Sequence, residues 1–379
     1  MKFNSRLLLP LIVPLLIACA DSGRRASQET GKNIVSHAQN LSIEDNDGYS
    51  LVNIRNPWDT THMLASYILI DRTRRLPEGV DTTGHTVIRV PIERSVIFSN
   101  VYVALVRELG MIDNVTGVCD TEYITDSIAA GLVRSGRIAN CGQSMSPNVE
   151  RIMALRPDGI ILSPMGPADK HGKLGVMGIP LIEAADYLEE TPLGRAEWMR
   201  FYGRLYGQGA KSDSLFATVQ RDYDNIRKLA SGARNKPTVL FDGIYSNVWN
   251  VPTSRSVTGN FIKDAGGTNP FESYEDVATA TLSPEKVMYQ AGNADVWMVR
   301  YFRPSTMTLA EWGKENEIYP RFKAFRNGQV YGSNTAVSGV FDDAAFHPQW
   351  ILADIAVILH PELAGRIPSK HYYMRLASE

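Results

Sequence analysis

The stretch SPNVERIMALRPDGIILSP, residues 146–164, has the pattern of a helix followed by a buried strand. Ser146 is expected to cap the helix, with Pro147 at its first position, and the apolar residues that follow recur at helical spacing. Pro157 ends this pattern, and the apolar run GIIL then predicts a strand. The stretch therefore predicts one helix–strand unit of an α/β sheet.

The same alternation of strands and helices extends on both sides of this stretch, and it is typical of parallel sheets. Between two such blocks lies a helical tract with apolar residues at i, i+3, i+4 and i+7. We therefore expect an α/β fold with two Rossmann-like lobes that contain parallel sheets, joined by a long interlobe helix. The expected bounds are 49–191 for the first lobe, which includes a β-rich preamble, 192–232 for the helix and 233–379 for the second lobe.

The N-terminus has the features of an export signal. Lys2 and Arg6 precede an apolar run that is too short for a comfortable transmembrane span. The run ends in LIAC, which resembles the bacterial lipobox and implies a signal peptide at residues 1–18 and a lipid on Cys19. Residues 19–48 are polar and nearly free of aromatic side chains, so we expect a flexible tether. The mature protein is then a lipid-anchored body in the cell envelope.

The net charge and the positions of the cysteines and histidines exclude some classes of function. The net charge is −2 without a basic block, which argues against a nucleic-acid partner. Cys119 and Cys141 follow expected strands of one lobe, and they either pair in an oxidising compartment or remain two buried thiols. The seven histidines are scattered, without a helical pair or a carboxylate cluster at ligand spacing, so we expect no direct metal site.

The order of these features along the chain resembles that in the substrate-binding lipoproteins of bacterial ABC importers. The resemblance is to the class that captures ferric siderophores, haem and cobalamin. The motifs that carry the resemblance lie within residues 90–365 and are SPNVERIMALRPDGIIL, IKDAGGTNPF, LSPEKVMYQAGNADVWMV and AFRNGQVYGSN. The resemblance implies a receptor, periplasmic or surface-facing, that delivers a metal chelate to a permease and its ATPase. We expect a monomer without a cofactor of its own. The β preamble is longer than in shorter members of that class.

The resemblance also implies that one glutamate on each lobe pairs with arginines of the permease, and the matching positions are Glu150 and Glu285. Charges on rigid helix starts steer a protein to its partner. Acidic residues in a first helical turn also stabilise any helix through its dipole, so a purely structural role is the alternative. The two positions differ in register, because Glu150 is four residues after Ser146 and Glu285 only two after Ser283.

The cleft between the lobes is expected to be lined by the loops at the carboxyl ends of the strands. Aromatic and sulfur-bearing residues in these loops suit a large, partly apolar ligand. Arg300 and Arg303 are expected to hold anionic groups of that ligand, unless they are surface arginines beside core aromatics. The expected ligand-binding residues are Tyr123, Met145, Tyr245, Trp249, Arg300, Tyr301 and Arg303.

Three functions follow from the sequence: a receptor of an ABC importer, a surface capture protein for the same ligands that acts without a transporter, and an exported hydrolase. GQSMS around Ser144 is the motif nearest to a nucleophile elbow, but Ser146 stands where G-x-S-x-G requires glycine. No His–Asp pair accompanies it. We therefore expect a binding protein rather than an enzyme. The interlobe helix further predicts that the lobes close by only a few degrees on ligand binding.

Overall fold

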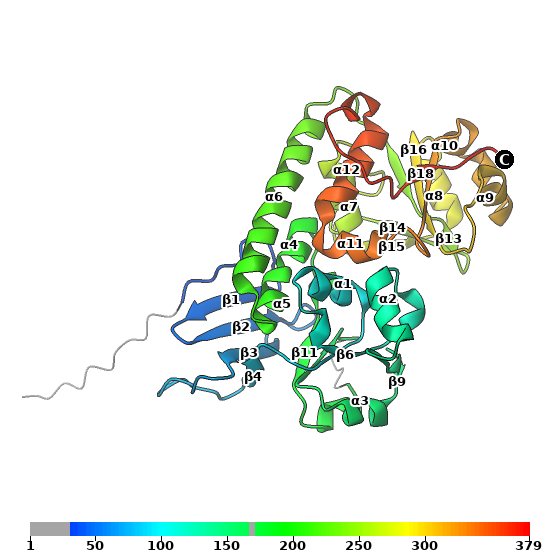
Figure 1. Cartoon of the computed structure of the whole chain (residues 1–379). Helices are drawn as coiled ribbons and strands as arrows, with labels where there is room; N and C mark the ends of the chain where they lie inside the picture. Colours follow the sequence, from blue (N-terminus) through cyan, green and yellow to red (C-terminus); the bar gives the residue numbers. More distant parts are fainter. Residues whose placement is uncertain (1–30, 167–170) are drawn as a thin grey trace, which may run out of the picture.

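The computed structural model describes residues 31–166 and 171–379. The expected signal peptide and Cys19 lie outside these residues. Two α/β lobes are joined by a helical bridge, and a small β-sheet lies beside the N-terminal lobe (Figure 1). This arrangement confirms the expected fold class. Within the described residues, no helix combines the length and the apolar character needed to cross a membrane.

The small sheet precedes the N-terminal lobe and has the strand order β1-β2-β3-β4, in which only β3 and β4 run parallel. Its alternate apolar side chains, among them Ile43, Val52 and Ile54, are buried in the main core. The period-two pattern of the preamble therefore does form a sheet with one buried face. The strands are β1 Leu41–Asn46, β2 Tyr49–Arg55, β3 Met63–Asp71 and β4 Thr86–Val90.

Residues 31–48 are not the flexible tether expected from composition. The backbone N–H groups of residues 36–38 donate to the Glu197 carboxylate at 2.6–3.0 Å, and those of residues 39 and 40 donate to Glu189 at 2.8 and 2.9 Å. Glu197 is fully buried and Glu189 nearly so. The prediction was wrong here because buried carboxylates on the bridge bind the backbone of this segment, which its own polar composition does not reveal.

The N-terminal lobe contains a five-stranded sheet in the order β11-β10-β5-β6-β7, with every neighbouring pair parallel. Its strands are β5 Ser95–Ile97, β6 Val115–Val118, β7 Ala139–Asn140, β10 Gly159–Leu162 and β11 Leu181–Glu183. Its helices are α1 Asn100–Glu108, α2 Ser127–Arg134 and α3 Val149–Leu155.

The start of α3 differs from the expectation. Ser146 and Pro147 form the short strand β9, which pairs with β8, Gly142–Gln143, and the N-cap is Asn148 instead. The Asn148 side chain accepts a hydrogen bond from the backbone N–H of Arg151 at 2.9 Å. Because the hairpin holds Ser146 extended and Asn148 is an equally good cap, the helix begins two residues later than expected.

The bridge consists of three helices rather than the single interlobe helix expected over residues 192–232. Gly207 has a φ of +67°, a left-handed conformation that separates the helix ending at Leu205 from the helix beginning at Gly209. The helices are α4 Pro192–Glu197, α5 Met199–Leu205 and α6 Gly209–Ser231. The 23 residues of α6 run alongside both lobes (Figure 1).

The C-terminal lobe is mixed rather than wholly parallel. Strands β12, β16 and β17 are parallel, β18 adds an antiparallel edge, and β13, β14 and β15 form a separate antiparallel sheet. The strands are β12 Val239–Phe241, β13 Ile244–Tyr245, β14 Val248–Pro252, β15 Thr279–Leu282, β16 Val296–Tyr301, β17 Val330–Asn334 and β18 Met374–Arg375. The helices are α7 Val257–Asp264, α8 Pro284–Ala291, α9 Leu309–Glu315, α10 Lys323–Arg326, α11 Val340–Phe346 and α12 Pro348–Leu359.

Short 3₁₀ turns complete the described chain. They are η1 Ile112–Asn114, η2 Thr121–Tyr123, η3 Leu174–Val176, η4 Asp186–Leu188, η5 Tyr319–Arg321 and η6 Pro361–Leu363.

An aromatic contact joins the two lobes and the bridge. The ring of Tyr102 on α1 lies 5.1 Å from that of Tyr202 on α5, and both pack against Phe346 on α11, with centroids 6.3 and 5.7 Å away. The hydroxyls of both tyrosines donate to the buried Asp186, at 2.7 and 3.2 Å. Because these contacts involve large buried groups on all three parts, they favour the small closure expected from the sequence, which stays a prediction.

Candidate functional site

A cavity of about 1100 Å³ lies between the lobes. Six of its lining residues come from the C-terminal lobe, and the larger share comes from the N-terminal lobe. Loops at the carboxyl ends of strands in both lobes contribute to its wall, as expected, but the loop around Tyr245 does not. The wall residues from the C-terminal lobe are Phe302, Thr335, Ala336, Gly339, Phe341 and Asp342.

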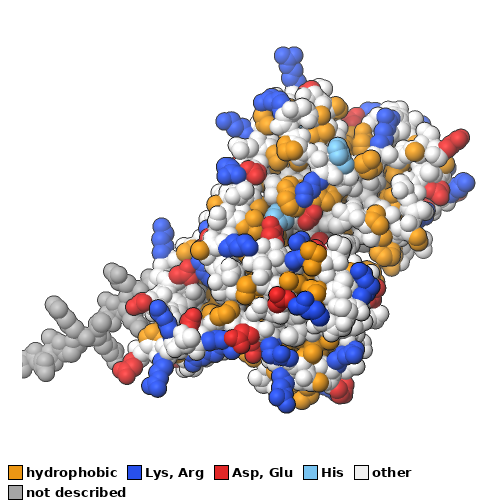
Figure 2. All heavy atoms as spheres, in the orientation of Figure 1, with side chains coloured by type: hydrophobic (Ala, Val, Ile, Leu, Met, Phe, Trp, Pro, Cys, Tyr) orange, Lys and Arg blue, Asp and Glu red, His pale blue; other side chains and the backbone are white. Residues whose placement is uncertain are grey.

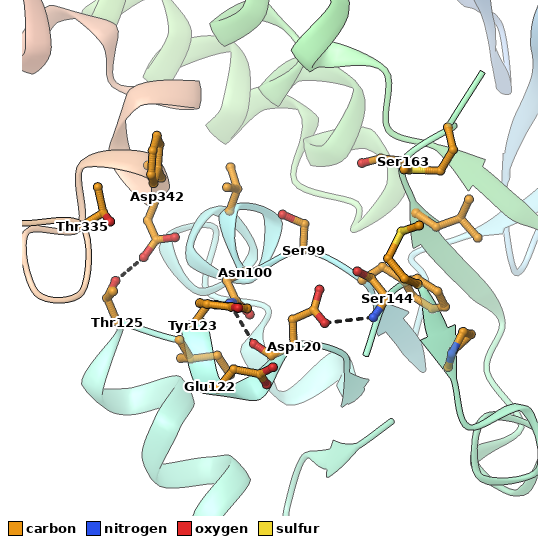
Figure 3. Close-up of a pocket in the computed structure, with 18 of the residues that line it drawn as sticks. Ser99, Asn100, Asp120, Glu122, Tyr123, Thr125, Ser144, Ser163, Thr335 and Asp342 are labelled. Carbon is orange, nitrogen blue, oxygen red and sulfur yellow. Dashed lines mark hydrogen bonds between the residues drawn. The ribbon is translucent and has the colours of Figure 1, made fainter. Parts of the chain in front are cut away.

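Asp120 organises the N-terminal wall just after strand β6. Its backbone is left-handed, with a φ of +51°, and its N–H donates to the Gly142 carbonyl at 2.9 Å. Its carboxylate accepts the backbone N–H of Ser144 at 2.9 Å, while its carbonyl accepts from the Asn100 side chain at 3.3 Å (Figure 3). These bonds connect the exits of β5 and β6 to the β8–β9 hairpin, and they position three loops of the wall together.

Aromatic and thioether groups supply the apolar part of the wall. Tyr123 and Phe302 meet edge to face across the cleft, with ring centroids 5.9 Å apart. Met145 is 74% exposed and Tyr123 is 55% exposed, so both leave much apolar surface uncovered. The structure thus places Tyr123 and Met145 in the cavity wall, where the sequence expected them, and their contact with a ligand stays a prediction.

A second contact crosses the cleft. The hydroxyl of Thr125, from the N-terminal lobe, donates to the carboxylate of Asp342 in the first turn of α11 (Figure 3). Burial raises the pKa of Asp342, and the hydrogen bond from Thr125 partly offsets this effect. Asp342 therefore contributes a carboxyl group to the wall that is less exposed than those of the loops opposite.

Trp249 does not line the cavity, contrary to the expectation. It is fully buried in an aromatic cluster of the C-terminal lobe, with its ring centroid 5.7 Å from Trp297, 5.9 Å from Tyr319 and 5.5 Å from Phe322. Its indole N–H donates to the Phe241 carbonyl at 3.0 Å. In the core, the apolar ring of a tryptophan is removed from water, and its N–H can still donate to a backbone carbonyl.

Tyr301 and Tyr245 also lie outside the cavity wall. Tyr301 packs against the same aromatic cluster, and its hydroxyl accepts the backbone N–H of Met307 at 3.1 Å. Tyr245 is 77% exposed on the short strand β13, away from the lining residues. The neighbouring Phe302 takes the place in the wall that the sequence assigned to Tyr301.

The two arginines expected to hold anionic ligand groups are engaged within the C-terminal lobe. Arg300 forms a two-pronged ion pair with Asp242, with 2.9 Å from Nε to Oδ1. Arg303 pairs with Glu315. Neither arginine belongs to the cavity wall, so the expected role is not supported by their positions. An arginine near the end of a strand pairs with a carboxylate when one is within reach, and Asp242 lies 58 residues from Arg300 in the sequence.

Sequence reasoning overlooked the acidic groups of the wall. Asp120, Glu122 and Asp342 all line the cavity. They lie in the stretches DTEYITD, residues 120–126, and SNTAVSGVFDD, residues 333–343, which lie at the carboxyl ends of strands in the two lobes. The density of carboxylates in these two loops was the available signal.

Glu150 and Glu285 occupy the same helical position despite their different spacing from the Ser-Pro pairs. Each is exposed and is the second residue of its helix, after the N-caps Asn148 and Ser283. The Glu285 carboxylate accepts hydrogen bonds from the backbone N–H of Glu285 and from the Ser283 side chain, and these bonds lower its pKa. The register difference seen in the sequence therefore disappears in the structure, and the docking role stays a prediction.

Cys119 and Cys141 are free thiols, both fully buried behind the cavity wall. Burial raises the pKa of Cys119 to about 12 and that of Cys141 to about 11. Of the two alternatives left open by the sequence, the structure shows the pair of buried thiols.

Within the described residues, no group of three or more His, Cys, Asp or Glu side chains could hold a metal ion. The two histidines nearest to the cleft are engaged with carboxylates: His171 lies 2.7 Å from Glu183, and His347 lies 2.8 Å from Glu108. The wall can therefore bind a large ligand through apolar faces and polar acceptors.

A family model described as periplasmic binding protein matches residues 96–335, which include parts of both lobes and most of the cavity wall. The chain belongs to the periplasmic binding protein family. An uncharacterized lipoprotein of Methanocaldococcus jannaschii is 28% identical over 301 residues, which cover 76% of this chain and 70% of that relative.

Solved structures of periplasmic binding proteins share the fold. CeuE of Helicobacter pylori in a Ni-His complex superimposes with a TM-score of 0.58 at 21% identity, covering 74% of this chain and 87% of that one. The periplasmic haem-binding protein of Vibrio cholerae superimposes with a TM-score of 0.57 at 17% identity, covering 71% and 100%. At these identities the likeness establishes the two-lobed architecture alone.

Proposed function

We propose that this periplasmic binding protein is the receptor of an ABC importer, that it captures a metal chelate of the siderophore, haem or corrinoid type between its lobes and that it delivers this ligand to the permease. The observation that carries the proposal is the cavity of about 1100 Å³ with walls from both lobes. This volume is at the upper end of small-molecule sites, which suits a bulky chelate rather than a single amino acid or a free ion.

The proposal includes a lipid anchor on Cys19 and a place outside the cytoplasm, supported by the LIAC motif and by the lipoprotein relative. Figure 2 shows acidic and basic side chains intermixed over the visible face, without a broad basic surface. This distribution supports a small-molecule ligand rather than nucleic acid. Replacing Cys19 with Ser should release the protein from the membrane fraction, because a lipid chain supplies its membrane affinity.

The function is tested by calorimetric titration of the full-length protein in mild detergent with haemin, cyanocobalamin and a panel of ferric siderophores. Saturable one-to-one binding of at least one chelate is expected, with each chelate also titrated into detergent alone as a control. Calorimetry is preferred to fluorescence because all six tryptophans lie in the described residues and outside the cavity wall. A folded protein that binds no chelate of the panel contradicts the proposal.

Delivery to a permease is supported by the matching positions of Glu150 and Glu285 at their helix starts. Exposed carboxylates steer association more than they add to affinity. Reversal of both charges, Glu150→Lys with Glu285→Lys, should abolish chelate uptake in complemented cells and leave binding in solution unchanged. The matched control is Glu275→Lys, an exposed carboxylate outside the cavity. Unchanged uptake by the double variant would favour a capture protein that acts without a transporter.

A further inference from the structure

The charges of the cavity wall are predominantly acidic among the residues that the structure describes. Asp120 and Glu122 come from the N-terminal lobe, and Asp342 comes from the C-terminal lobe. None of the three forms an ion pair with a described residue under a 4.0 Å limit. The basic side chains of the described wall are Lys173, which is exposed, and His171, whose ring nitrogen lies 2.7 Å from the Glu183 carboxylate. Among the described wall residues, the carboxylates Asp120, Glu122 and Asp342 therefore outnumber the basic side chains.

The arginines near the cleft do not offset this surplus. The guanidinium of Arg300 lies 5.8 Å from the ring centroid of Phe341, and Phe341 lines the wall whereas Arg300 does not. The charge of Arg300 is compensated by Asp242, and that of Arg303 by Glu315. A polyanionic ligand would find no arginine in the described wall to pair with.

Besides hydroxyl groups, which can both donate and accept, the described wall carries side chains with oxygens that only accept. The side-chain oxygen of Asn100 is buried and has no hydrogen-bond partner, while its amide nitrogen is occupied by the Asp120 carbonyl (Figure 3). A buried acceptor without a donor costs free energy, so a donor on the ligand would stabilise the complex. The carboxylates of Glu122 and Asp120 add further acceptors, and the faces of Tyr123 and Phe302 attract cations.

From this arrangement we infer that the cleft takes a neutral or cationic metal chelate that carries N–H or ammonium groups, and that it discriminates against chelates with carboxylates or other net negative charge. The inference rests on the proposed function and specifies its substrate class. Amide-bearing corrinoids and amine-bearing hydroxamate chelates have this chemistry, whereas haem and catecholate chelates do not.

The test uses two series of chelates whose members differ in net charge. The first is ferrioxamine B, which is cationic, with its neutral N-acetyl and anionic N-succinyl derivatives. The second is aquocobalamin, which is cationic, with neutral cyanocobalamin and its anionic monocarboxylic acid. Each is titrated calorimetrically into the full-length protein in mild detergent. In a series that binds, the cationic and neutral members should bind more tightly than the anionic member, and the affinity of the cation should fall as salt is added.

Two variants show whether the wall carboxylates cause this order. Glu122→Gln and Asp342→Asn should each lower the affinity for the cationic member of a series, roughly three- to tenfold relative to the affinity for the neutral member. Asn at position 342 keeps an acceptor for Thr125, and Glu122 is exposed, so neither change removes a packing contact. Glu275→Gln, which removes a charge outside the cavity, is the control and should leave the ratio unchanged.

The outcomes are distinguishable. If the anionic member binds most tightly, or if both wall variants leave the ratio of affinities unchanged, the inference is overturned and the proposed function stands. If only haemin or another anionic chelate binds, the inference is overturned and the proposed function stands. If neither series nor any chelate of the wider panel binds to the folded protein, the proposed function fails, and the inference that rests on it fails with it.

Discussion

Asp120 and Asp242 occupy similar places in the two lobes, but their carboxylates have different partners. Each follows a buried parallel strand, β6 or β12, and each has a left-handed backbone, with φ of +51° and +56°. Asp120 accepts a backbone N–H from the next loop and lines the cavity, whereas Asp242 is paired with Arg300. One strand-exit carboxylate is therefore presented to a ligand, and the other holds its own lobe together.

The aromatic residues show the same contrast. In the C-terminal lobe, Trp249, Trp297 and Tyr319 are buried together behind the strands. In the N-terminal lobe, Tyr123 and Met145 are exposed in the wall. The N-terminal lobe therefore provides most of the cavity wall, to which the C-terminal lobe adds Phe302 and Phe341, while the buried aromatic cluster stabilises the C-terminal lobe.

The largest expected effect is on the aromatic cluster of the C-terminal lobe. Trp297→Ala should reduce the free energy of unfolding by about 4 kcal/mol, because Trp297 is fully buried and a large cavity would remain. Phe302→Ala, whose ring is 62% exposed, should cost less than about 1 kcal/mol and weaken ligand binding instead. Urea denaturation measures both, and equal losses for the two variants would contradict the contrast between the buried aromatic cluster and the exposed cavity wall.

The two aspartates give the most direct comparison. Asp242→Asn should cost about 2 kcal/mol of folding free energy, because it leaves the partly buried Arg300 without its counter-charge. Asp120→Asn keeps the oxygen that accepts from Ser144, so it should cost less than about 0.5 kcal/mol. Chemical denaturation near neutral pH measures both variants. A larger loss for Asp120→Asn would show that Asp120 is structural and not presented to a ligand.

The thiols behind the N-terminal wall should make the stability pH-dependent. Burial raises the pKa of Cys119 to about 12 and that of Cys141 to about 11, from an ordinary value of 9.0. The unfolded chain then loses these protons first, so the stabilisation is complete below about pH 9 and is lost as the pH rises through the folded values. About 1 kcal/mol per thiol should be lost by about pH 10.

Unfolding experiments between about pH 8 and pH 10 test this prediction against the double variant Cys119→Ala with Cys141→Ala. The double variant should lose less stability over this interval than the unmodified protein. Identical pH profiles would mean that the thiols ionise as easily in the folded chain as in the unfolded one.

The smallest effect is expected at Arg303. Its ion pair with Glu315 is 36% exposed on both sides, and such surface pairs contribute little. Arg303→Ala should change the free energy of unfolding by less than about 0.5 kcal/mol and leave chelate affinity unchanged. A clear loss of chelate affinity in calorimetry would show that Arg303 contacts the ligand in the bound state. The C-terminal lobe would then contribute more to ligand binding than the unbound structure indicates.

The sequence predicted the elements well where the pattern was local. Ser283 caps α8 as its Ser-Pro pair indicates, but the similar pair at Ser146 belongs to a hairpin, and Asn148 caps α3. Only this tertiary pairing shows that Glu150 and Glu285 are both second residues of their helices. The exits of the strands were also predicted correctly as the site of the cleft, since loop position follows from strand order.

By itself, then, the sequence determined the two α/β lobes, their order and the loops that form the cleft, because hydrophobic periodicity is set by neighbours a few residues apart. Only the tertiary structure decided which side chains of those loops reach the cavity. Arg300 turns to Asp242, 58 residues away, and the segment at residues 36–40 binds carboxylates about 150 residues further on. Such choices depend on partners that are brought together only by folding, and they make the cavity wall acidic rather than basic.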